Sequence, residues 1–370
     1  MSADTAFVSF LAAFASPPVE LVLFGRLDPV GGVYPHFLPD EILFVPLPHY
    51  PTVRDLRGLV RALSRSVRAF REELPRLDAV WLFGPHPLSL LFARLARRRG
   101  VPVFLGVRQE FVPYVAGRLP SRRWLWVVPV AHALELAYRR LARTCPTAVV
   151  GRVLERTYAR GGGRVLATTV SLVRETDLIR VEDALARDWD GAATLELLTV
   201  GRIEPEKNPL LLADVLERLR ERDPRWRLTV VGDGPLREAL AARLRERGLD
   251  DSVDLAGYVP AGEELWRRYR ASHAFLHVSL TEGVPQVLVE AQAAGLPVVA
   301  TDVGGVRDAL GKSGLLVPQE DADAAVAQLE ELRTDAELRA RLIRDGLESA
   351  RAQTLEARVA EISGFFGLRG

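Results

Sequence analysis

Two glutamates and the start of a helix lie close together in the segment TEGVPQVLVEAQAAGLPVVAT, residues 281–301. Glu282 precedes a helix that we expect to open near Pro285, and Glu290 lies about two turns into that helix. Proline suits a first helical turn because its missing N–H is unpaired there. The free N–H groups of the next residues then offer a phosphate site at the positive end of the helix dipole. These residues are Gln286, Val287 and Leu288.

Carboxylates on both sides of a phosphate site suit a ligand whose hydroxyl groups flank a phosphate. A sugar nucleotide has that chemistry. Taken alone, the segment is equally consistent with a buried α/β helix that carries two surface glutamates, because short motifs produce false positives. Charged residues elsewhere in the chain are needed to distinguish the two interpretations.

Two cations flank a second loop, GRIEPEKN, which follows an apolar strand. Arg202 and Lys207 should leave the same sheet edge as Glu282, since ligands bind beyond the carboxyl ends of parallel strands. Two cations and a helix N-terminus can hold a diphosphate and stabilise its charge as it departs. For Arg202 the alternative is a surface ion pair with Glu204 or Glu206. For Lys207 it is a solvated loop charge.

Length and composition indicate a two-domain intracellular protein. The 370 residues exceed what one hydrophobic core usually supports. The single cysteine, Cys145, cannot form an internal disulfide, which favours a reducing compartment. No apolar stretch is long enough to span a bilayer, and the apolar segment 6–15 lacks the basic residues that precede a signal peptide core. We therefore expect a cytoplasmic protein.

Charge divides the chain into two unlike halves. Residues 1–190 hold 26 arginines, no lysine and 18 acidic residues, a net charge of +8. Residues 191–370 hold 23 basic and 30 acidic residues, a net charge of −7. Such a split indicates different partners for the two halves. Only Lys207 and Lys312 are lysines, so each one indicates a role that arginine does not fill.

Short apolar strands alternate with amphipathic helices along the chain, as in parallel α/β layers. We expect an N-terminal Rossmann-like domain over residues 1–175 and a C-terminal domain over residues 176–349, with helix 350–370 packing back on the first. The glycine-rich and polar stretch 161–193 is interpreted as the linker. The first domain opens with a helix, so it lacks the strand and Gly-rich loop with which such a domain normally begins.

Residues 195–320 resemble the donor-binding domain of retaining glycosyltransferases of family 4 (the glycosyltransferase group 1 type). The matching pieces, in order, are LLTVGRIEPEKN, VVGDGPL, LAGYVP, EGVPQVLVE with AxxxGLPVVAT, DVGG and SGLLVP. Their order and spacing are far more specific than any single piece. The resemblance implies the α/β GT-B fold, in which two Rossmann-like domains face each other across a cleft. It also implies sugar transfer from a nucleoside-diphosphate sugar with retention of configuration.

The resemblance implies a role for each matching residue. Arg202 and Lys207 would grip the donor diphosphate, and Glu282 would contact the sugar, making these three the catalytic set. Glu290 would bind the ribose hydroxyls. The departing diphosphate would accept the proton, and neither a metal nor another cofactor is expected. Further donor contacts are implied for Gly201, Tyr258, Val259, Gly283, Val284, Pro285, Gln286, Val287 and Leu288, with Tyr258 and Val259 against the base.

The acceptor side departs from the family's pattern. The family often carries a histidine after the strand that we expect at residues 101–107, where this chain has Arg108, Gln109 and Glu110. His86 could compensate, although a histidine after Gly-Pro is more often structural. His86, Arg108 and Glu110 are the acceptor-side candidates. Where the family often has glycine after the lysine, Asn208 stands here and is predicted to cap the next helix.

Neither Asp-x-Asp sequence requires a metal. The one at 321–323 opens a helix, where aspartate is favoured as a cap, and the one at 188–190 lies in the predicted linker. His273 and His277 sit in or beside a buried strand without suitably spaced partners. We interpret both histidines as packing residues.

The first domain should hold the acceptor, which could be a glycan, a lipid-linked glycan or a small molecule. The arginine face of helix 54–74 and the segment RRWLW at 122–126 suit an anionic membrane at its inner face. The alternative is a solvated helix face with a buried apolar segment. Nucleic acid is not expected, because no binding motif accompanies the charge.

Three other functions compete with sugar transfer. A non-catalytic sugar-nucleotide-binding or scaffold protein is consistent with the missing N-terminal loop and the missing family histidine. Another GT-B enzyme, such as an epimerase or a phosphorylase, is less favoured. Phosphorylases of this architecture hold pyridoxal phosphate on a lysine, and neither Lys207 nor Lys312 has a suitable setting. A Rossmann oxidoreductase is disfavoured because no G-x-G-x-x-G follows a strand.

Overall fold

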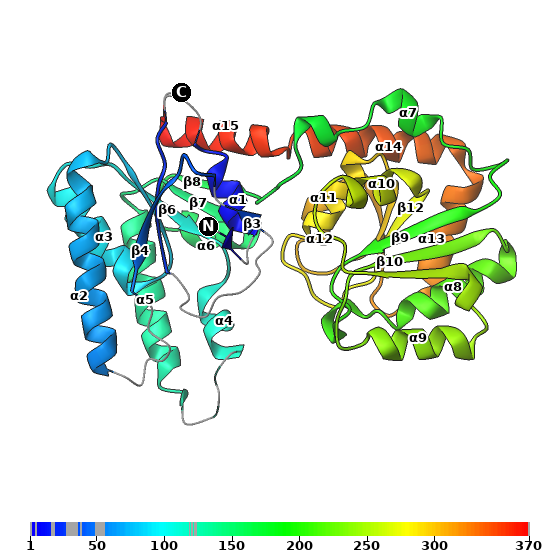
Figure 1. Cartoon of the computed structure of the whole chain (residues 1–370), viewed down its shortest axis with the longest axis horizontal. Coiled ribbons are helices and arrows are strands. Elements are labelled where there is room, and N and C mark those ends of the chain that lie inside the picture. The colour runs from blue at the N-terminus through cyan, green and yellow to red at the C-terminus, as the bar shows by residue number, and fades with distance from the viewer. Residues whose placement is uncertain are drawn as a thin grey trace. The chain divides into compact units, whose positions relative to one another are not determined.

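The chain folds into two compact α/β units (Figure 1). The first comprises residues 1–170 with 358–370, and the second comprises residues 171–357. The computed structural model describes residues 2–3, 6–15, 19–26, 36–37, 39–48, 56–117, 119, 121 and 124–368. Each unit is built on parallel strands, as the alternation of strands and helices predicts.

The second unit is organised around a six-stranded parallel sheet. Its strand order is β11-β10-β9-β12-β13-β14. The bounds are β9 (Leu195–Val200), β10 (Trp226–Val231), β11 (Val253–Gly257), β12 (Ala274–His277), β13 (Val298–Thr301) and β14 (Gly314–Val317). Successive strands run outward from β9 on one side and from β12 on the other. The carboxyl ends of β9 and β12 are therefore the topological switch point, where ligands bind in such sheets.

Helices cover both faces of this sheet, which explains why its strands read as nearly continuous apolar runs. One core joins the sheet to α8 (Leu211–Arg222), α9 (Arg237–Glu246) and α13 (Ala322–Thr334). The other joins it to α10 (Glu263–Ala271), α11 (Gln286–Ala293) and α12 (Val306–Leu310). Along β9, Leu197 enters the first core and Leu198 the second. Around these layers lie α7 (Val181–Leu185) and α14 (Ala336–Arg351), which packs on α11.

The first unit contains a four-stranded parallel sheet in the order β5-β6-β7-β8. Its strands are β5 (Val80–Phe83), β6 (Val103–Val107), β7 (Thr147–Val150) and β8 (Val165–Thr168). The strand β8 lies inside the stretch that we interpreted as a linker, so that interpretation is wrong for its first part. Gly161, Gly162 and Gly163 form a tight turn between the helix over residues 152–159 and β8. Gly163 is needed there because an added Cβ would lie 2.2 Å from the carbonyl oxygen of Ala142.

Smaller sheets and helices complete the first unit. The strand β2 (Val22–Arg26) pairs in parallel with β4 (Leu43–Leu47), and β1 (Ser2–Ala3) pairs antiparallel with β3 (His36–Phe37). The predicted opening helix is present as α1, and the two residues of β1 precede it. The helices are α1 (Ala6–Ala12), α2 (Leu56–Glu73), α3 (Pro87–Arg98), α4 (Phe111–Gly117), α5 (Val127–Ala142) and α6 (Arg152–Ala159).

The terminal helix α15 (Leu355–Phe366) enters the first unit from residue 358 onward. The ring of Phe366 stacks on Phe104 of β6 with 4.2 Å between their centroids. Arg164 donates a hydrogen bond to the carbonyl oxygen of Phe365 at 3.0 Å. The end of the chain is thereby part of the core around the first sheet.

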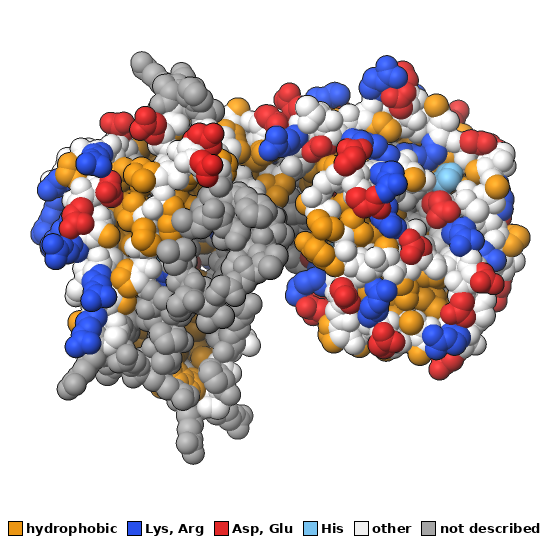
Figure 2. All heavy atoms as spheres, viewed as in Figure 1, with side chains coloured by type: hydrophobic (Ala, Val, Ile, Leu, Met, Phe, Trp, Pro, Cys, Tyr) orange, Lys and Arg blue, Asp and Glu red, His pale blue; other side chains and the backbone are white. Residues whose placement is uncertain are grey.

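Basic and aromatic side chains lie on the surface of the first unit. Arg61, Arg65 and Arg68 are exposed on α2, where Figure 2 shows basic side chains gathered. Trp126 is 61% exposed and stacks on Trp124, so this part of the RRWLW segment is not buried. Arg122 and Arg123 lie outside the described residues. Among the helices that the structure describes, none is long and apolar enough to cross a bilayer.

Candidate functional site

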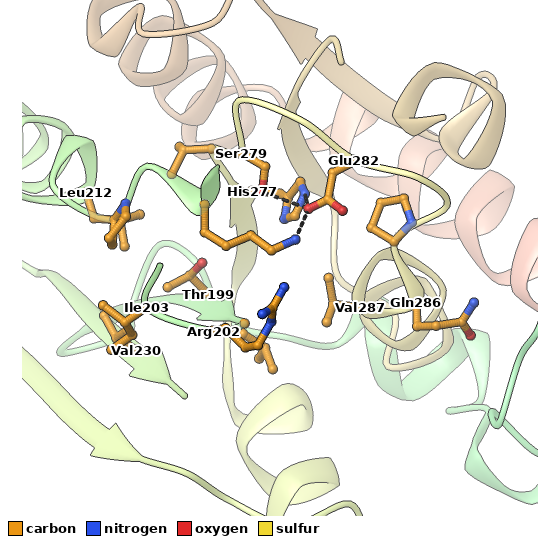
Figure 3. A pocket seen from close by; sticks show the side chains of 16 residues that line it. Thr199, Arg202, Ile203, Leu212, Val230, His277, Ser279, Glu282, Gln286 and Val287 are labelled. Carbon is orange, nitrogen blue, oxygen red and sulfur yellow. Dashed lines mark hydrogen bonds and ion pairs between the residues drawn. The ribbon is translucent and has the colours of Figure 1, made fainter. Parts of the chain in front are cut away.

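A cavity of about 240 Å³ opens at the carboxyl ends of β9 and β12 (Figure 3). Its walls come from the loop after β9, the loop after β12 and the first turn of α11. It lies at the switch point of the sheet, where the sequence predicted a site. Seven of the predicted site residues line it: Gly201, Arg202, Lys207, Glu282, Pro285, Gln286 and Val287.

Lys207 and Glu282 form an ion pair in this cavity. Nζ of Lys207 lies 2.5 Å from Oε1 of Glu282, and the two side chains are only 22% and 8% exposed. Lys207 is therefore not a solvated loop charge. The two loops are also joined through the backbone, because the N–H of Leu280 donates to the carbonyl oxygen of Glu206 at 2.8 Å.

Two further side chains contact the Glu282 carboxylate, and a third holds one of these two residues in place. Ser279 Oγ donates to Oε1 at 2.8 Å, and His277 Nε2 lies 2.9 Å from the same oxygen without the alignment of a full hydrogen bond. Thr301 Oγ1 donates to the carbonyl oxygen of Ser279 at 2.6 Å. Our interpretation of His277 as a packing residue is wrong, since its ring lines the cavity beside Glu282 (Figure 3).

These contacts keep Glu282 ionised. Burial by itself raises the pKa of this carboxyl, but the contacts with His277, Lys207 and Ser279 together outweigh burial and lower the pKa to about 2. All three neighbours act on Oε1. None of the hydrogen bonds that the described residues form reaches Oε2, so this second oxygen is available to a ligand.

Glycines of the VVGDGPL and DVGG motifs hold the two site loops by close backbone contact. A Cβ at Gly232 would lie 1.8 Å from the carbonyl oxygen of Gly201, and a Cβ at Gly304 would lie 1.9 Å from that of Glu282. Both glycines have positive φ, at 139° and 50°. The motif glycines therefore support the loops that carry the ion pair, and a larger residue would push those loops away.

Asn208 does not cap the following helix, contrary to our expectation. It follows a 3₁₀ turn at Pro205–Lys207 with φ 49° and ψ 45°, and α8 begins only at Leu211. This left-handed conformation costs glycine nothing, and asparagine tolerates it better than most residues. The backbone thus explains why glycine, the family's usual residue, and asparagine are both suitable after the lysine.

Replacing Asn208 with valine should lower the free energy of unfolding by about 1–3 kcal/mol, because a β-branched residue is strained at positive φ. Replacing it with glycine should change stability little, since the buried Nδ2 of Asn208 has no hydrogen-bond partner among the described residues to lose. Urea denaturation of the two variants and the parent chain measures the difference. A valine variant as stable as the glycine variant would contradict this account.

Arg202 lines the cavity from its exposed rim. Its guanidinium pairs with Glu204 at 2.5 Å and with Glu206 at 3.1 Å, and its side chain is 65% exposed. The surface ion pairs of our alternative interpretation are therefore present. Exposed pairs of this kind contribute little to stability, so Arg202 can exchange them for a ligand at small cost.

Fewer N–H groups are free at the start of α11 than the sequence predicted. Pro285 is the N-cap residue of α11 and not its first helical residue. Leu288 is fully buried, and its N–H donates to the carbonyl oxygen of Pro285 at 3.3 Å. Leu288 therefore cannot offer a free N–H to a phosphate. The N–H groups that remain for such contact belong to Gln286 and Val287, which line the cavity.

The remaining donor candidates lie outside the cavity lining. Glu290 accepts a hydrogen bond from the Tyr269 hydroxyl at 2.7 Å, and burial raises the pKa of its carboxyl. Tyr258 is 63% exposed just after β11, whereas Val259 and Val284 pack against the core. The carbonyl oxygen of Gly283 accepts a hydrogen bond from the N–H of Gly305 at 2.9 Å.

The acceptor-side candidates lie beyond the carboxyl ends of β5 and β6. His86 caps α3 by accepting a hydrogen bond from the N–H of Leu88 at 3.2 Å. Its pKa is lowered to about 4, mainly by burial. The guanidinium of Arg108 lies 3.9 Å from the centre of the Phe7 ring. Glu110 is exposed, and its carbonyl oxygen accepts from the N–H of Tyr114. His86 thus has the structural role that we considered as the alternative.

Three residues that shape the site were not predicted from the sequence: His277, Ser279 and Thr301. The spacing of His277 and Ser279 at the end of a strand offered a signal, because side chains two residues apart in an extended chain point to the same side. By contrast, the helix cap at Asp321 is confirmed, since its side chain accepts a hydrogen bond from the N–H of Ala324.

Residues 193–349 match the family described as glycosyl transferases group 1. WcaL of Salmonella typhimurium, a putative colanic acid biosynthesis glycosyltransferase, is 31% identical over 163 residues, which cover 42% of this chain and 38% of that protein. Sulfoquinovosyl transferase SQD2 of Arabidopsis thaliana is 27% identical over 306 residues, covering 80% of this chain and 56% of that protein. The chain thus matches roughly two fifths to just over half of the length of these relatives.

The fold is similar to that of Anabaena Alr3699/HepE, solved in complex with UDP. The TM-score is 0.72 at 14% identity, and the match covers 99% of this chain and 97% of that one. This likeness includes both units and confirms the predicted GT-B class, with its two Rossmann-like α/β domains. The structural likeness shows that the chain has the GT-B fold, and the family match identifies residues 193–349 as a glycosyl transferases group 1 domain.

Proposed function

We propose that the chain transfers a sugar from a nucleoside-diphosphate sugar to an acceptor with retention of anomeric configuration. The observation that carries this proposal is the buried Lys207–Glu282 pair, which lines a cavity at the switch point of a group 1 domain. Because the two groups are held side by side, the cation can contact the diphosphate and the carboxylate can contact the sugar of the same ligand.

The cations act on the leaving group. Lys207 and Arg202 neutralise the diphosphate as the bond to the sugar breaks, and the first N–H groups of α11 add the positive end of the helix dipole. Arg202 reaches the ligand by giving up its exposed ion pairs with Glu204 and Glu206. Charge that develops on the diphosphate is thus met by Lys207 and the start of α11, which are already in place, and by Arg202 once it leaves its surface ion pairs.

Glu282 orients the sugar and does not attack it. Its Oε1 is held by three side chains, and its pKa of about 2 makes it a weak base. Oε2 remains free to accept a hydrogen bond from a sugar hydroxyl. The departing diphosphate then takes the proton of the acceptor hydroxyl on the face from which it leaves, which accounts for retention. In the same proposal Glu290 binds the ribose, and Tyr258 with Val259 lies against the base.

Transfer should continue at an unchanged rate in millimolar EDTA. Two cations and a helix N-terminus supply the neutralisation for which other enzymes use a divalent ion. Initial rates with and without EDTA, after dialysis against chelator, measure the effect. A loss of activity that Mg²⁺ or Mn²⁺ restores would contradict this part of the proposal.

The acceptor and the place of action are also proposals. A glycan or lipid-linked acceptor would meet the first unit near His86, Arg108 and Glu110, and the cytoplasmic face of a membrane would meet its basic surface. The exposed arginines of α2 and the exposed Trp126 support that contact. The relatives named above include a putative colanic acid biosynthesis glycosyltransferase and a sulfoquinovosyl transferase.

A donor screen tests the proposed function. Thermal shift with UDP-, GDP- and ADP-sugars should show stabilisation by one donor class, and UDP-sugars come first because HepE was solved with UDP and with UDP-glucose. Transfer from the stabilising donor is then measured on candidate acceptors. Binding without transfer to any acceptor would favour the non-catalytic alternative. Absence of binding by every donor would overturn both.

A further inference from the structure

A second cavity, of about 100 Å³, lies in the first unit between the end of α5 and the end of α6. Four arginines face it: Arg139, Arg140 and Arg143 of α5, and Arg160 just after α6. Tyr158 of α6 lines it as well. This site shares no residue with the lining of the candidate active site.

None of the four arginines forms an ion pair with another described residue, although the Glu135 carboxylate acts on Arg139 from a longer distance. Among the described residues, no carboxylate lies within 4.0 Å of any of these guanidinium groups, whereas Asp214 of α8 pairs with both Arg243 and Arg247. Cations at helix C-termini are favoured by the helix dipole, which accounts for one or two of them. The helix dipole does not account for four arginines around one cavity, because their like charges repel one another. An anion in the cavity would remove that repulsion.

A buried hydroxyl lines the same cavity. Tyr158 is 2% exposed, and its hydroxyl is paired with the carboxylate of Glu135. Among the described residues this pair falls short of the geometry of a full hydrogen bond. The loosely formed pair leaves the hydroxyl able to turn toward a ligand oxygen in the cavity.

The glycine turn at 161–163 builds one wall of this cavity. A Cβ at Gly163 would lie 2.2 Å from the carbonyl oxygen of Ala142, so only glycine lets the turn pack on the end of α5. A Cβ at Gly161 would lie 3.0 Å from Cγ of Arg143, so the Arg143 side chain rests on this glycine. The three glycines therefore shape the cavity and place one of its arginines.

We propose that this cavity binds a phosphate group, carried either by a small phosphorylated molecule or by a lipid headgroup. Guanidinium groups bind phosphate oxygens in pairs of parallel hydrogen bonds, and four of them surround the cavity. The helices α5 and α6 end where β7 and β8 begin, so the site lies at the amino edge of the sheet. His86, Arg108 and Glu110 lie at the carboxyl edge, and the bound phosphate is therefore separate from the acceptor position of the proposed reaction.

Two binding measurements on the full chain test this site. Inorganic phosphate and pyrophosphate are titrated with thermal shift as the readout, and phosphatidylcholine vesicles with and without phosphatidic acid are used for co-sedimentation. The pocket variant Arg140→Gln/Arg143→Gln should weaken whichever binding is seen at least ~10-fold. The control Arg341→Gln/Arg344→Gln removes the same charge from the exposed face of α14 in the second unit and should weaken it little.

Each outcome decides the proposal. Binding of free phosphate that the pocket variant loses identifies a small phosphorylated ligand. Binding confined to phosphatidic acid vesicles, and lost only in the pocket variant, identifies a lipid headgroup. Binding in neither assay, or an equal loss in the control, overturns the site in favour of diffuse surface charge. Should the double variant fold poorly by circular dichroism, Arg143→Lys replaces it, because it keeps the charge and should still weaken binding by losing the paired hydrogen bonds.

Discussion

Replacing Lys207 with alanine should lower the transfer rate at least ~10-fold, because a charged contact to a leaving group is strongest when that group departs. The loss should fall mainly on kcat, since the donor keeps its other contacts in the ground state. Removing the ammonium also leaves the Glu282 carboxylate with one partner fewer in a site where it is 8% exposed. Initial rates over a range of donor concentrations separate kcat from KM.

The second lysine of the chain provides the matched control. Lys312 is exposed after α12, away from the cavity lining, so Lys312→Ala removes the same charge and should leave the rate unchanged. A third variant, Lys207→Arg, tests whether lysine itself is needed, and it should recover only part of the activity. A parental rate in Lys207→Ala would remove Lys207 from the site.

The strands and the site loops could be predicted because their signals are local. Apolar runs marked β9, β10, β12 and β13, and the ends of β9 and β12 meet because parallel strands order their loops at one edge. Lys207 and Glu282 come from different loops, and they can pair because both loops leave the same edge of the sheet. Sequence spacing alone could place both at one edge but could not show that they touch.

The incorrect predictions share a physical cause. Each depended on the local backbone conformation, on how closely two backbone segments pack, or on which side chain a residue contacts. Asn208 was interpreted from its preference for helix caps, but the structure uses its tolerance of positive φ. The glycines at 161–163 looked like a flexible linker, yet they allow a turn to pack on α5. His277 has no partner at a metal-like spacing, and its partner, Glu282, comes into reach only when the loop after β12 turns back.

Replacing Gly304 with alanine should lower the transfer rate by roughly 100-fold, although this residue is not among those lining the cavity. A Cβ there would lie 1.9 Å from the carbonyl oxygen of Glu282, so one of the two loops must move. A displacement of about 1 Å at a catalytic group can cost roughly 100-fold in rate. The rate is measured with the donor and acceptor used for Lys207→Ala.

Gly311 separates loop displacement from backbone strain. Its φ of 55° is close to the 50° of Gly304, but an added Cβ there meets no described atom within 4 Å. With ψ at −114° the backbone of Gly311 is strained for any other residue, so Gly311→Ala should cost about 1–3 kcal/mol in stability and leave the rate nearly unchanged. Equal loss of rate in both variants would assign the effect to strain. A loss confined to Gly304→Ala would show that the position of Glu282 depends on backbone contact between two loops, which only glycine permits.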